Sequence, residues 1–251
     1  MKVAYIYLLK ESLRFKKVIP WLLLSFAAMI LATVWKRFDS SATQTDSYVN
    51  VVNILVFRLL PLASAIYTTM IVSQEVEQKT IVYLLTRPIQ RWQLLIGRWG
   101  ATVTAVTALS FIGIVAAFIG SRGAQVSIGM DLLAVLLGAL AYGSLFLFIT
   151  LIFNRALIIC VLFAFGWESS VPNLPTGLQS LSVLAHMQAI AKHPEAEGGK
   201  KFLELIAGVL GDSKLTASSS AFGLLIFSIA MVGLSCYWFT THEYIPREDA
   251  D

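Results

Sequence analysis

The run DLLAVLLGALAYGSLFLFITLIF, residues 131–153, carries one charged side chain, at its first position. A hydrocarbon core about 30 Å thick is crossed by about 20 apolar residues in a helix that rises about 1.5 Å per residue. The apolar residues of this run form a block and do not follow the period of an amphipathic helix. The run is therefore long enough and apolar enough to form a transmembrane helix.

The whole chain shares this composition. Of its 251 residues, 57% are hydrophobic and 14% are charged, whereas soluble domains have about 45–50% and about 25%. Mean hydropathy is +0.74, and a soluble core of this size could not bury so many apolar side chains. The composition excludes a soluble enzyme, a secreted disulfide scaffold and a nucleic-acid-binding domain. Cys160 and Cys236 fall inside apolar blocks and are interpreted as buried thiols.

We therefore predict an all-α polytopic membrane protein that forms a single transmembrane domain over residues 1–251. Six transmembrane helices are expected, over residues 18–35, 51–73, 100–120, 131–153, 156–167 and 221–241. The fifth of these is too short to cross comfortably. The first could be a cleaved signal peptide, but its long apolar run and the lack of a small-residue cleavage site favour a retained anchor.

The lysines and arginines near the ends of the spans predict that both termini are cytoplasmic. With the N-terminus inside, the cytoplasmic side carries eleven of these residues and the outer side seven, while Arg58 is intramembrane. Four of the outer seven lie in one longer loop, where the rule is weaker. The net charge of +4 is thus interpreted as a signal of orientation.

Residues 1–17 are predicted to form an N-terminal interfacial helix. Lys10, Arg14 and Lys17 fall on one face at helical spacing, which is typical of a basic amphipathic helix that lies in the membrane interface. The alternative is a simple cytoplasmic extension of the first span.

The largest cytoplasmic segment, residues 74–98, is predicted to form two helices. Pro88 cannot continue a preceding helix but is favourable in the first turn of a new one. In the second helix, one apolar arc is expected to face the inner interface, with Arg98 on the opposite face; the arc consists of Ile89, Trp92, Leu95, Ile96 and Trp99. A partly apolar cytoplasmic helix between two spans indicates a docking element for another protein.

This segment, QEVEQKTIVYLLTRPIQRWQLLIGR, resembles the segment between the second and third spans of ABC-2-type transporter permeases. The expected layout of six spans and the basic N-terminal helix are similar as well. The resemblance implies a coupling helix that docks on a separate ATPase. The residues that match its motif are Glu75, Glu77, Lys79, Thr80, Leu84, Leu85, Arg87, Pro88 and Arg91. Many members carry a glycine before the threonine, where this chain has Lys79.

The resemblance also implies the partners and the direction of transport. A cytoplasmic ABC ATPase subunit is expected, together with a second permease as a homodimer or heterodimer in the inner (plasma) membrane, and export is favoured. The chain contains no G-x-x-x-x-G-K-[ST] loop. It is therefore expected not to be an enzyme and to hold no cofactor, with ATP and Mg²⁺ bound by the partner.

Two ionisable residues are predicted at membrane depth, Arg58 in the second span and Glu168 at the end of the fifth. Such residues are costly in the bilayer and need a partner or a function. Counting along the helices places them at similar depths, so we expect them to form an intramembrane charge pair. The alternative is that Arg58 extends toward the outer surface and Glu168 meets outer water. Asp131 is interpreted as an ordinary interface charge.

Residues 168–218 are predicted to form an outer re-entrant element followed by a loop, since Pro172, Pro175 and Gly177 interrupt an apolar stretch. Two other functions compete with a permease. An intramembrane enzyme lacks support, because the chain has no HExxH motif and its acids are scattered. A membrane scaffold or sensor could use the same docking helix without transport. The apolar spans favour lipid-like or amphipathic cargo over ions.

Overall fold

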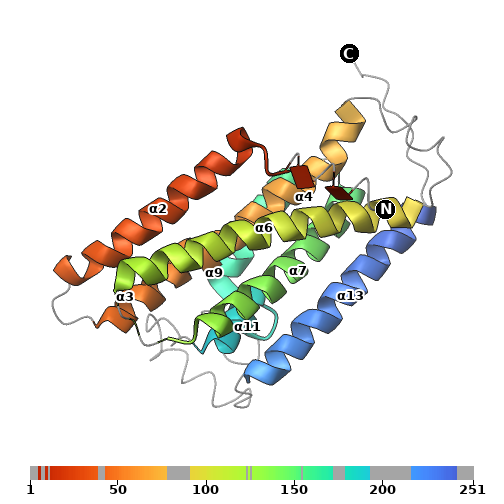
Figure 1. Cartoon of the computed structure of the whole chain (residues 1–251). Coiled ribbons are helices and arrows are strands. Elements are labelled where there is room, and N and C mark those ends of the chain that lie inside the picture. The colour runs from red at the N-terminus through yellow and green to blue at the C-terminus, as the bar shows by residue number, and fades with distance from the viewer. Residues whose placement is uncertain are drawn as a thin grey trace.

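The structure, a computed structural model, describes residues 5–6, 9–10, 12–38, 43–77, 91–122, 124, 126–153, 155–171, 179–192 and 216–241, and no strand occurs among them. The helices lie side by side in one bundle (Figure 1). In chain order they are α2 (Phe15–Phe38), α3 (Gln44–Val51), the π-helix η1 (Val52–Phe57), α4 (Leu60–Glu77), α6 (Arg91–Ser121), α7 (Ile128–Ile152), α8 (Ala156–Leu162), the π-helix η2 (Phe163–Trp167), α9 (Glu168–Ser170), α11 (Val183–Ala191) and α13 (Ala217–Thr241).

Five helices in the described part of the chain are long and apolar enough to cross a membrane. They are Lys16–Trp35, Gln44–Met70, Trp92–Ser121, Ile128–Ile152 and Ala217–Thr241. They confirm the prediction of an all-α, multi-pass membrane protein and correspond to five of the six predicted spans. The remaining one, predicted at 156–167, is the shorter apolar helix Ala156–Ser170, whose length falls below the core thickness of about 30 Å.

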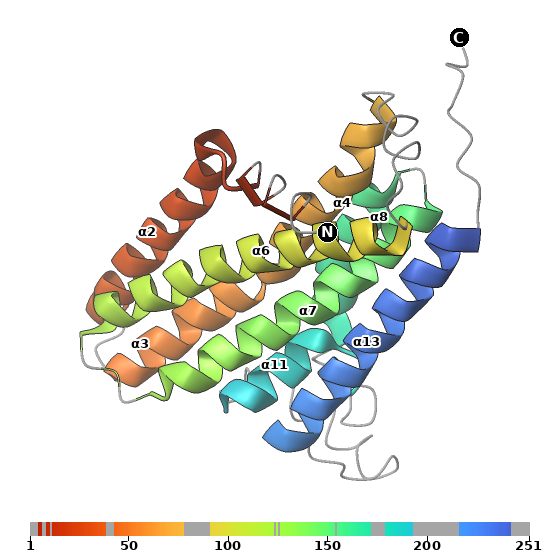
Figure 2. The ribbon, with the colours of Figure 1, turned by 45° about the vertical axis from the view of Figure 1, so that its right-hand side comes forward.

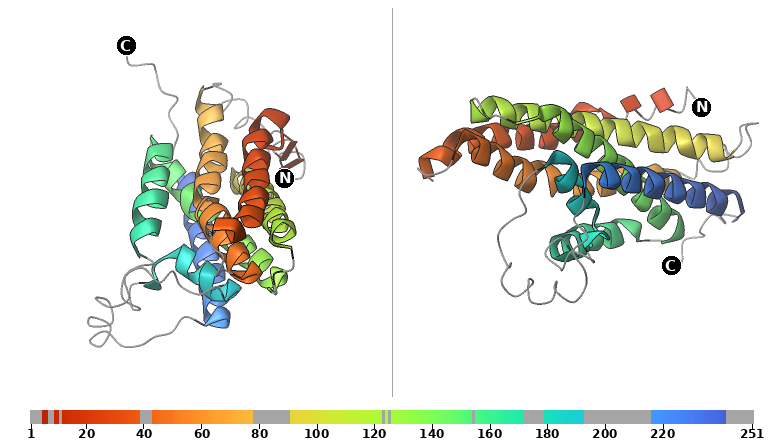
Figure 3. Two further views of the ribbon diagram at one scale, coloured as in Figure 1. Left: turned by 90° about the vertical axis from the view of Figure 1, so that its left-hand side faces the viewer. Right: turned by 90° about the horizontal axis from the view of Figure 1, so that it is seen from below.

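The directions of the helices show where this short helix belongs. Figures 1 and 2 show α7 and α13 running the same way through the bundle, with α6 running the opposite way. The chain must therefore return to the other end between α7 and α13, and the described parts of that return are α8, η2, α9 and α11. Seen from the side, α2 and α8 lie on opposite flanks of α4 (Figure 3).

The centre of the bundle is α7, which packs against α4, α6, α11 and α13. In its most apolar window 61% of the residues are buried, compared with 17% in α2 and in α13. Those two outer helices expose large apolar side chains, such as Phe26 (57%) and Ile229 (71%). Exposed apolar side chains on outer helices are expected where lipid replaces water as the solvent.

The helix of the second span begins earlier than the predicted residue 51. Thr43 caps α3: its N–H donates to Asp46 Oδ2 at 2.9 Å and its hydroxyl accepts from the Asp46 N–H at 3.2 Å. This reciprocal arrangement is a capping box, which satisfies N–H groups that a helix start would otherwise leave without partners. The candidate membrane span thus includes the polar first turns of α3 and reaches at least to Met70.

The second predicted helix of the segment at 74–98 is, in its described part, continuous with the third span. From Arg91 to Ser121 the chain forms the single helix α6, since no proline or turn signal interrupts it near residue 100. Leu95 of the predicted apolar arc is buried, as expected, but Trp92 is 41% exposed. Arg98, which was expected on the polar face, is instead buried.

The N-terminal residues differ from the predicted helix over 1–17 as well. The chain turns at Leu13–Arg14, and α2 begins at Phe15, so Lys17 belongs to the helix of the first span. The Arg14 carbonyl accepts from the Lys17 N–H at 2.8 Å, which starts that helix. Before the turn, the Tyr5 hydroxyl donates to Thr104 Oγ1 of α6 at 3.2 Å.

The contact between α2 and α6 depends on a glycine. A Cβ atom at Gly120 would collide with the Met29 carbonyl oxygen, so only glycine permits this approach of the two backbones. The Thr33 hydroxyl donates to the Gly120 carbonyl at 3.2 Å. This small-residue contact and its hydrogen bond hold α2 against the C-terminal end of α6.

Candidate functional site

Two π-helical segments lie in different parts of the bundle, and each is followed directly by a charged residue. The Arg58 N–H donates to the Asn53 carbonyl after η1, and the Glu168 N–H donates to the Phe163 carbonyl after η2. Both bonds span five residues, one more than in an α-helix. π-helical turns are rare in proteins, and those that occur are frequently found at functional sites. Arg58 and Glu168 are also the two intramembrane charges that the sequence analysis singled out.

A cavity of about 180 Å³ lies between these two segments. Its walls come from the second span, from the return after α7 and from α11. They are Ile54, Arg58, Leu59, Pro61, Ala164, Phe165, Glu168, Ser169 and Leu184. The structure thus brings Arg58 and Glu168 to one cavity. No ion pair joins these two described side chains.

The carboxylate of Glu168 is buried and holds the start of α11. Its Oε2 accepts from the Ser182 hydroxyl at 2.6 Å and from the Leu184 N–H at 3.2 Å, and its Oε1 accepts from the Val183 N–H at 3.2 Å. The first N–H groups of a helix lack partners within the helix and carry partial positive charge. Glu168 therefore binds α11 to the fifth predicted span.

Ser182 completes this junction. While its hydroxyl donates to Glu168, the same oxygen accepts from the Ala185 N–H at 3.2 Å, as an N-cap residue does. The Tyr142 hydroxyl of α7 interacts electrostatically with Glu168, although it has no partner at hydrogen-bonding geometry. The carboxylate thus accepts hydrogen bonds from Ser182 and from the first turn of α11, and the Tyr142 hydroxyl lies nearby.

A glycine on α7 allows α11 to lie deep in the bundle. A Cβ atom at Gly138 would collide with Met187 Sδ and would lie 2.9 Å from Leu60 Cδ2. Met187 and Ile190 of α11 are both buried. The predicted outer element after the fifth span therefore includes a helix packed against α7 and α13, while residues 172–178 and 193–215 lie outside the described residues.

Arg58 has a different environment from Glu168. Its side chain is exposed, and its neighbours on the cavity wall include the exposed apolar residues Ile54 (51%) and Phe165 (55%). It stands fourteen residues after the start of α3 at Gln44 and nineteen before the end of α4 at Glu77. Arg58 therefore lies well inside the helix formed by α3, η1 and α4, directly after η1.

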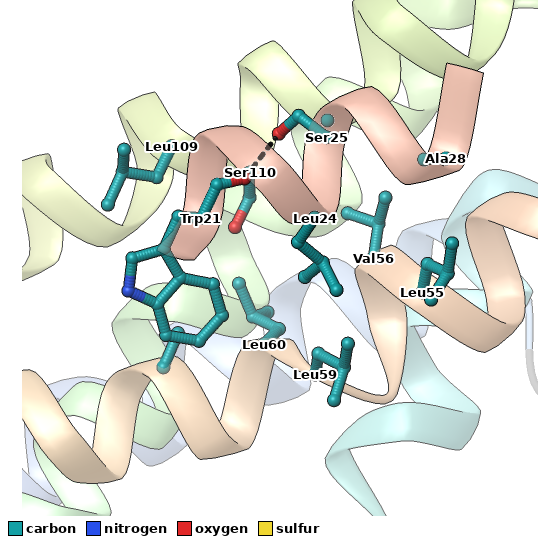
Figure 4. Close-up of a pocket in the computed structure, with 12 residues that line it drawn as sticks. Trp21, Leu24, Ser25, Ala28, Leu55, Val56, Leu59, Leu60, Leu109 and Ser110 are labelled. Atoms are coloured by element: carbon teal, nitrogen blue, oxygen red, sulfur yellow. Dashed lines mark hydrogen bonds between the residues drawn. The ribbon is translucent and has the colours of Figure 1, made fainter. Parts of the chain in front are cut away.

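A second pocket differs in chemistry from this cavity. It has a volume of about 30 Å³ and lies between α2, α6 and the second span. Figure 4 shows Trp21 and Leu24 of α2 turned toward the same space as Leu59 and Leu60. No charged side chain lines it, and its volume is about that of one water molecule. It is a packing gap between helices.

The predicted coupling residues are only partly covered by the structure. Glu75 and Glu77 lie in the last turn of α4, and Arg91 is the first residue of α6, with their side chains not described. The rest of the motif lies outside the described residues, namely Lys79, Thr80, Leu84, Leu85, Arg87 and Pro88. The ends of α4 and α6 that flank this segment lie at the same end of the bundle as the start of α2 and the end of α13 (Figure 2).

The sequence analysis missed a buried charged residue. Asp131 was interpreted as an interface charge, but it is 1% exposed and its Oδ2 accepts from the Tyr48 hydroxyl at 2.5 Å. This bond joins the start of α7 to α3. The position of Asp131 in the first turn of α7 was visible in the sequence, but its partner comes from another helix.

Other groups supply no cofactor site in the described part of the chain. No cluster of three or more histidine, cysteine, aspartate or glutamate side chains there could hold a metal ion. Cys160 is a buried free thiol, as predicted, and Cys236 is partly buried and also free. The cavity at Arg58 is a polar site within the helices that the structure describes.

Comparison with known proteins identifies one family. The model of the ABC-2 family transporter protein matches residues 8–178, which include the predicted coupling segment and both π-helical segments. No curated protein matches the chain.

Proposed function

The chain belongs to the ABC-2 family of transporter proteins and is a permease subunit of an ABC transporter. We propose that it exports its substrate and that a separate ATPase, docked on residues 74–98, supplies the energy. The ATPase would bind the ATP and Mg²⁺. Two permease chains, identical or related, would enclose the pathway in the inner (plasma) membrane.

The observation that carries this proposal is the position of the coupling segment within the matched region. The family match spans residues 8–178, and the segment follows α4 and precedes α6 at one end of the bundle. The positive-inside rule assigns that end to the cytoplasm, where an ATPase is available. Both termini would lie on the same side.

The continuity of α6 supports a coupling role. Its first residue, Arg91, belongs to the motif, and the helix extends without a break to Ser121. Leu95 packs with Leu147 and Leu151 of α7. A partner bound at the start of α6 would therefore act on the central helix of the bundle as well as on α6.

The test is co-purification of a candidate ABC ATPase subunit, together with permease-stimulated ATP hydrolysis. Glu75→Lys/Glu77→Lys reverses the charge at the end of α4 and is expected to weaken ATPase association, because charges at an interface govern partner choice and association rate. Gln44→Lys/Ser127→Lys is the control, since both residues are exposed at the opposite end of the bundle.

Three outcomes separate the alternatives. Loss of the ATPase only with the glutamate variant supports docking at this segment. Equal retention and stimulation by wild type and both variants would exclude it as the coupling surface. If no ATPase co-purifies with the wild type, a membrane scaffold or sensor becomes the better interpretation.

A further inference from the structure

The cavity at Arg58 contains an exposed cation that has no acidic partner among the described residues. An arginine stays protonated in proteins, and a cation at the centre of a membrane helix is costly unless an anion, water or a cavity compensates it. Arg58 lies within the candidate membrane span Gln44–Met70, and its side chain is exposed. Its position therefore requires a compensating group.

The neighbouring carboxylate does not serve as that group. Glu168 is 2% exposed, and its two oxygens accept from Ser182, Val183 and Leu184 at the start of α11. Those donors offset its negative charge and fix its orientation. The accessible charge of the cavity is thus the guanidinium of Arg58.

The remaining walls define the rest of the ligand. Apart from Arg58, Glu168 and Ser169, the cavity is lined by apolar side chains. Its volume of about 180 Å³ is below the range of about 300–1,000 Å³ that encloses a whole drug-sized ligand. The cavity can hold a small head group, whereas an attached chain would lie outside it, over Ile54 and Phe165, which are 51% and 55% exposed.

We infer that this cavity binds the anionic head group of an amphiphile, a phosphate or carboxylate held by Arg58, with its apolar chain lying against Ile54 and Phe165. Arginine suits this role because its planar fork of N–H donors matches a phosphate or carboxylate with two parallel hydrogen bonds. The inference concerns binding alone and does not depend on ATPase docking or on the direction of transport.

The test measures binding of dodecyl phosphate to the purified full-length chain in a non-ionic detergent, by native mass spectrometry or calorimetry. Arg58→Gln is expected to weaken binding by about ten- to one-hundred-fold, since it removes a charge-assisted contact. Arg58→Lys keeps the charge and should lose less. Arg155→Gln, which removes an exposed arginine at the start of α8, should bind like the wild type.

Two further measurements test whether the bound anion must carry an apolar chain and whether the apolar wall of the cavity contacts that chain. Inorganic phosphate at the same concentration should not displace dodecyl phosphate, and equal competition would overturn an amphiphile site. Phe165→Ala should weaken binding of dodecyl phosphate severalfold, because it removes an apolar contact with the chain. Unchanged binding by Arg58→Gln, with its thermal stability retained, would overturn the inference. The inference would also be overturned if Arg58→Gln changed the oligomeric state and left binding unchanged, because a second copy of the chain would then compensate the charge of Arg58.

Discussion

The two π-helical segments share a backbone geometry but differ in the fate of the charge that follows each. After η2, Glu168 is buried and accepts three hydrogen bonds from the start of α11. After η1, Arg58 is exposed on the wall of the same cavity. Both residues line the cavity, but only Glu168 has a helix start packed against it that supplies hydrogen-bond donors. Glu168 thus serves the fold, and Arg58 remains available to a ligand.

The largest expected effect tests the structural half of this comparison. Glu168→Ala leaves the N–H groups of Val183 and Leu184 and the Ser182 hydroxyl without their acceptor. A buried donor without a partner costs about 1–3 kcal/mol, so the loss of stability should reach about 3 kcal/mol or more. Thermal unfolding in detergent measures it, and Ser170→Ala, at an exposed residue of α9, is the control. Equal melting temperatures for the two variants would show that Glu168 does not hold α11.

A smaller loss of stability is expected for a substitution at the contact between α11 and α7. Gly138→Ala places a methyl group against Met187 and Leu60, and overpacking a core typically costs about 1–3 kcal/mol. Gly223→Ala is the matched control, because nothing lies within 4 Å of its Cβ position, and it should leave the melting temperature almost unchanged. If Gly138→Ala were as stable as Gly223→Ala, α11 would not pack closely on α7.

The smallest effect is expected for Arg58. Its side chain makes no ion pair with Glu168, so Arg58→Ala should change stability little or raise it slightly by removing an intramembrane charge. The Arg58→Ala/Glu168→Ala double variant should then be additive within about 0.5 kcal/mol. Additive changes in stability would fit separate roles for Arg58 and Glu168. A coupling energy of about 1 kcal/mol or more would instead support the direct pair that the sequence predicts.

The number and type of the long helices could be predicted because a transmembrane helix needs only length and apolar composition. The fourth span, predicted at 131–153, is α7 at Ile128–Ile152, and the last, predicted at 221–241, ends where α13 ends, at Thr241. The start of the second span was also encoded locally, in the pattern Thr43-x-x-Asp46 of a capping box.

The features that could not be predicted depend on contacts between helices. Neither Val52–Phe57 nor Phe163–Trp167 contains a proline or another local signal for a π-helix. Asp131 is buried because Tyr48 of α3 lies opposite it. The sequence spacing predicted similar membrane depths for Arg58 and Glu168. It could not predict that the hydrogen-bond donors to Glu168 come from the start of α11.

The unbroken length of α6 has a mechanical consequence. With 31 residues and a rise of about 1.5 Å each, it is a rod of about 46 Å. If its first turn is held and the rod tilts by about 5°, its far end is displaced by about 4 Å, given the same rise per residue. Gly120 and Thr33 fasten α2 at that far end, so the first helix would be carried along. A force applied beside Arg91 would then reach the opposite face of the membrane as a lever movement, without any change in the helix itself.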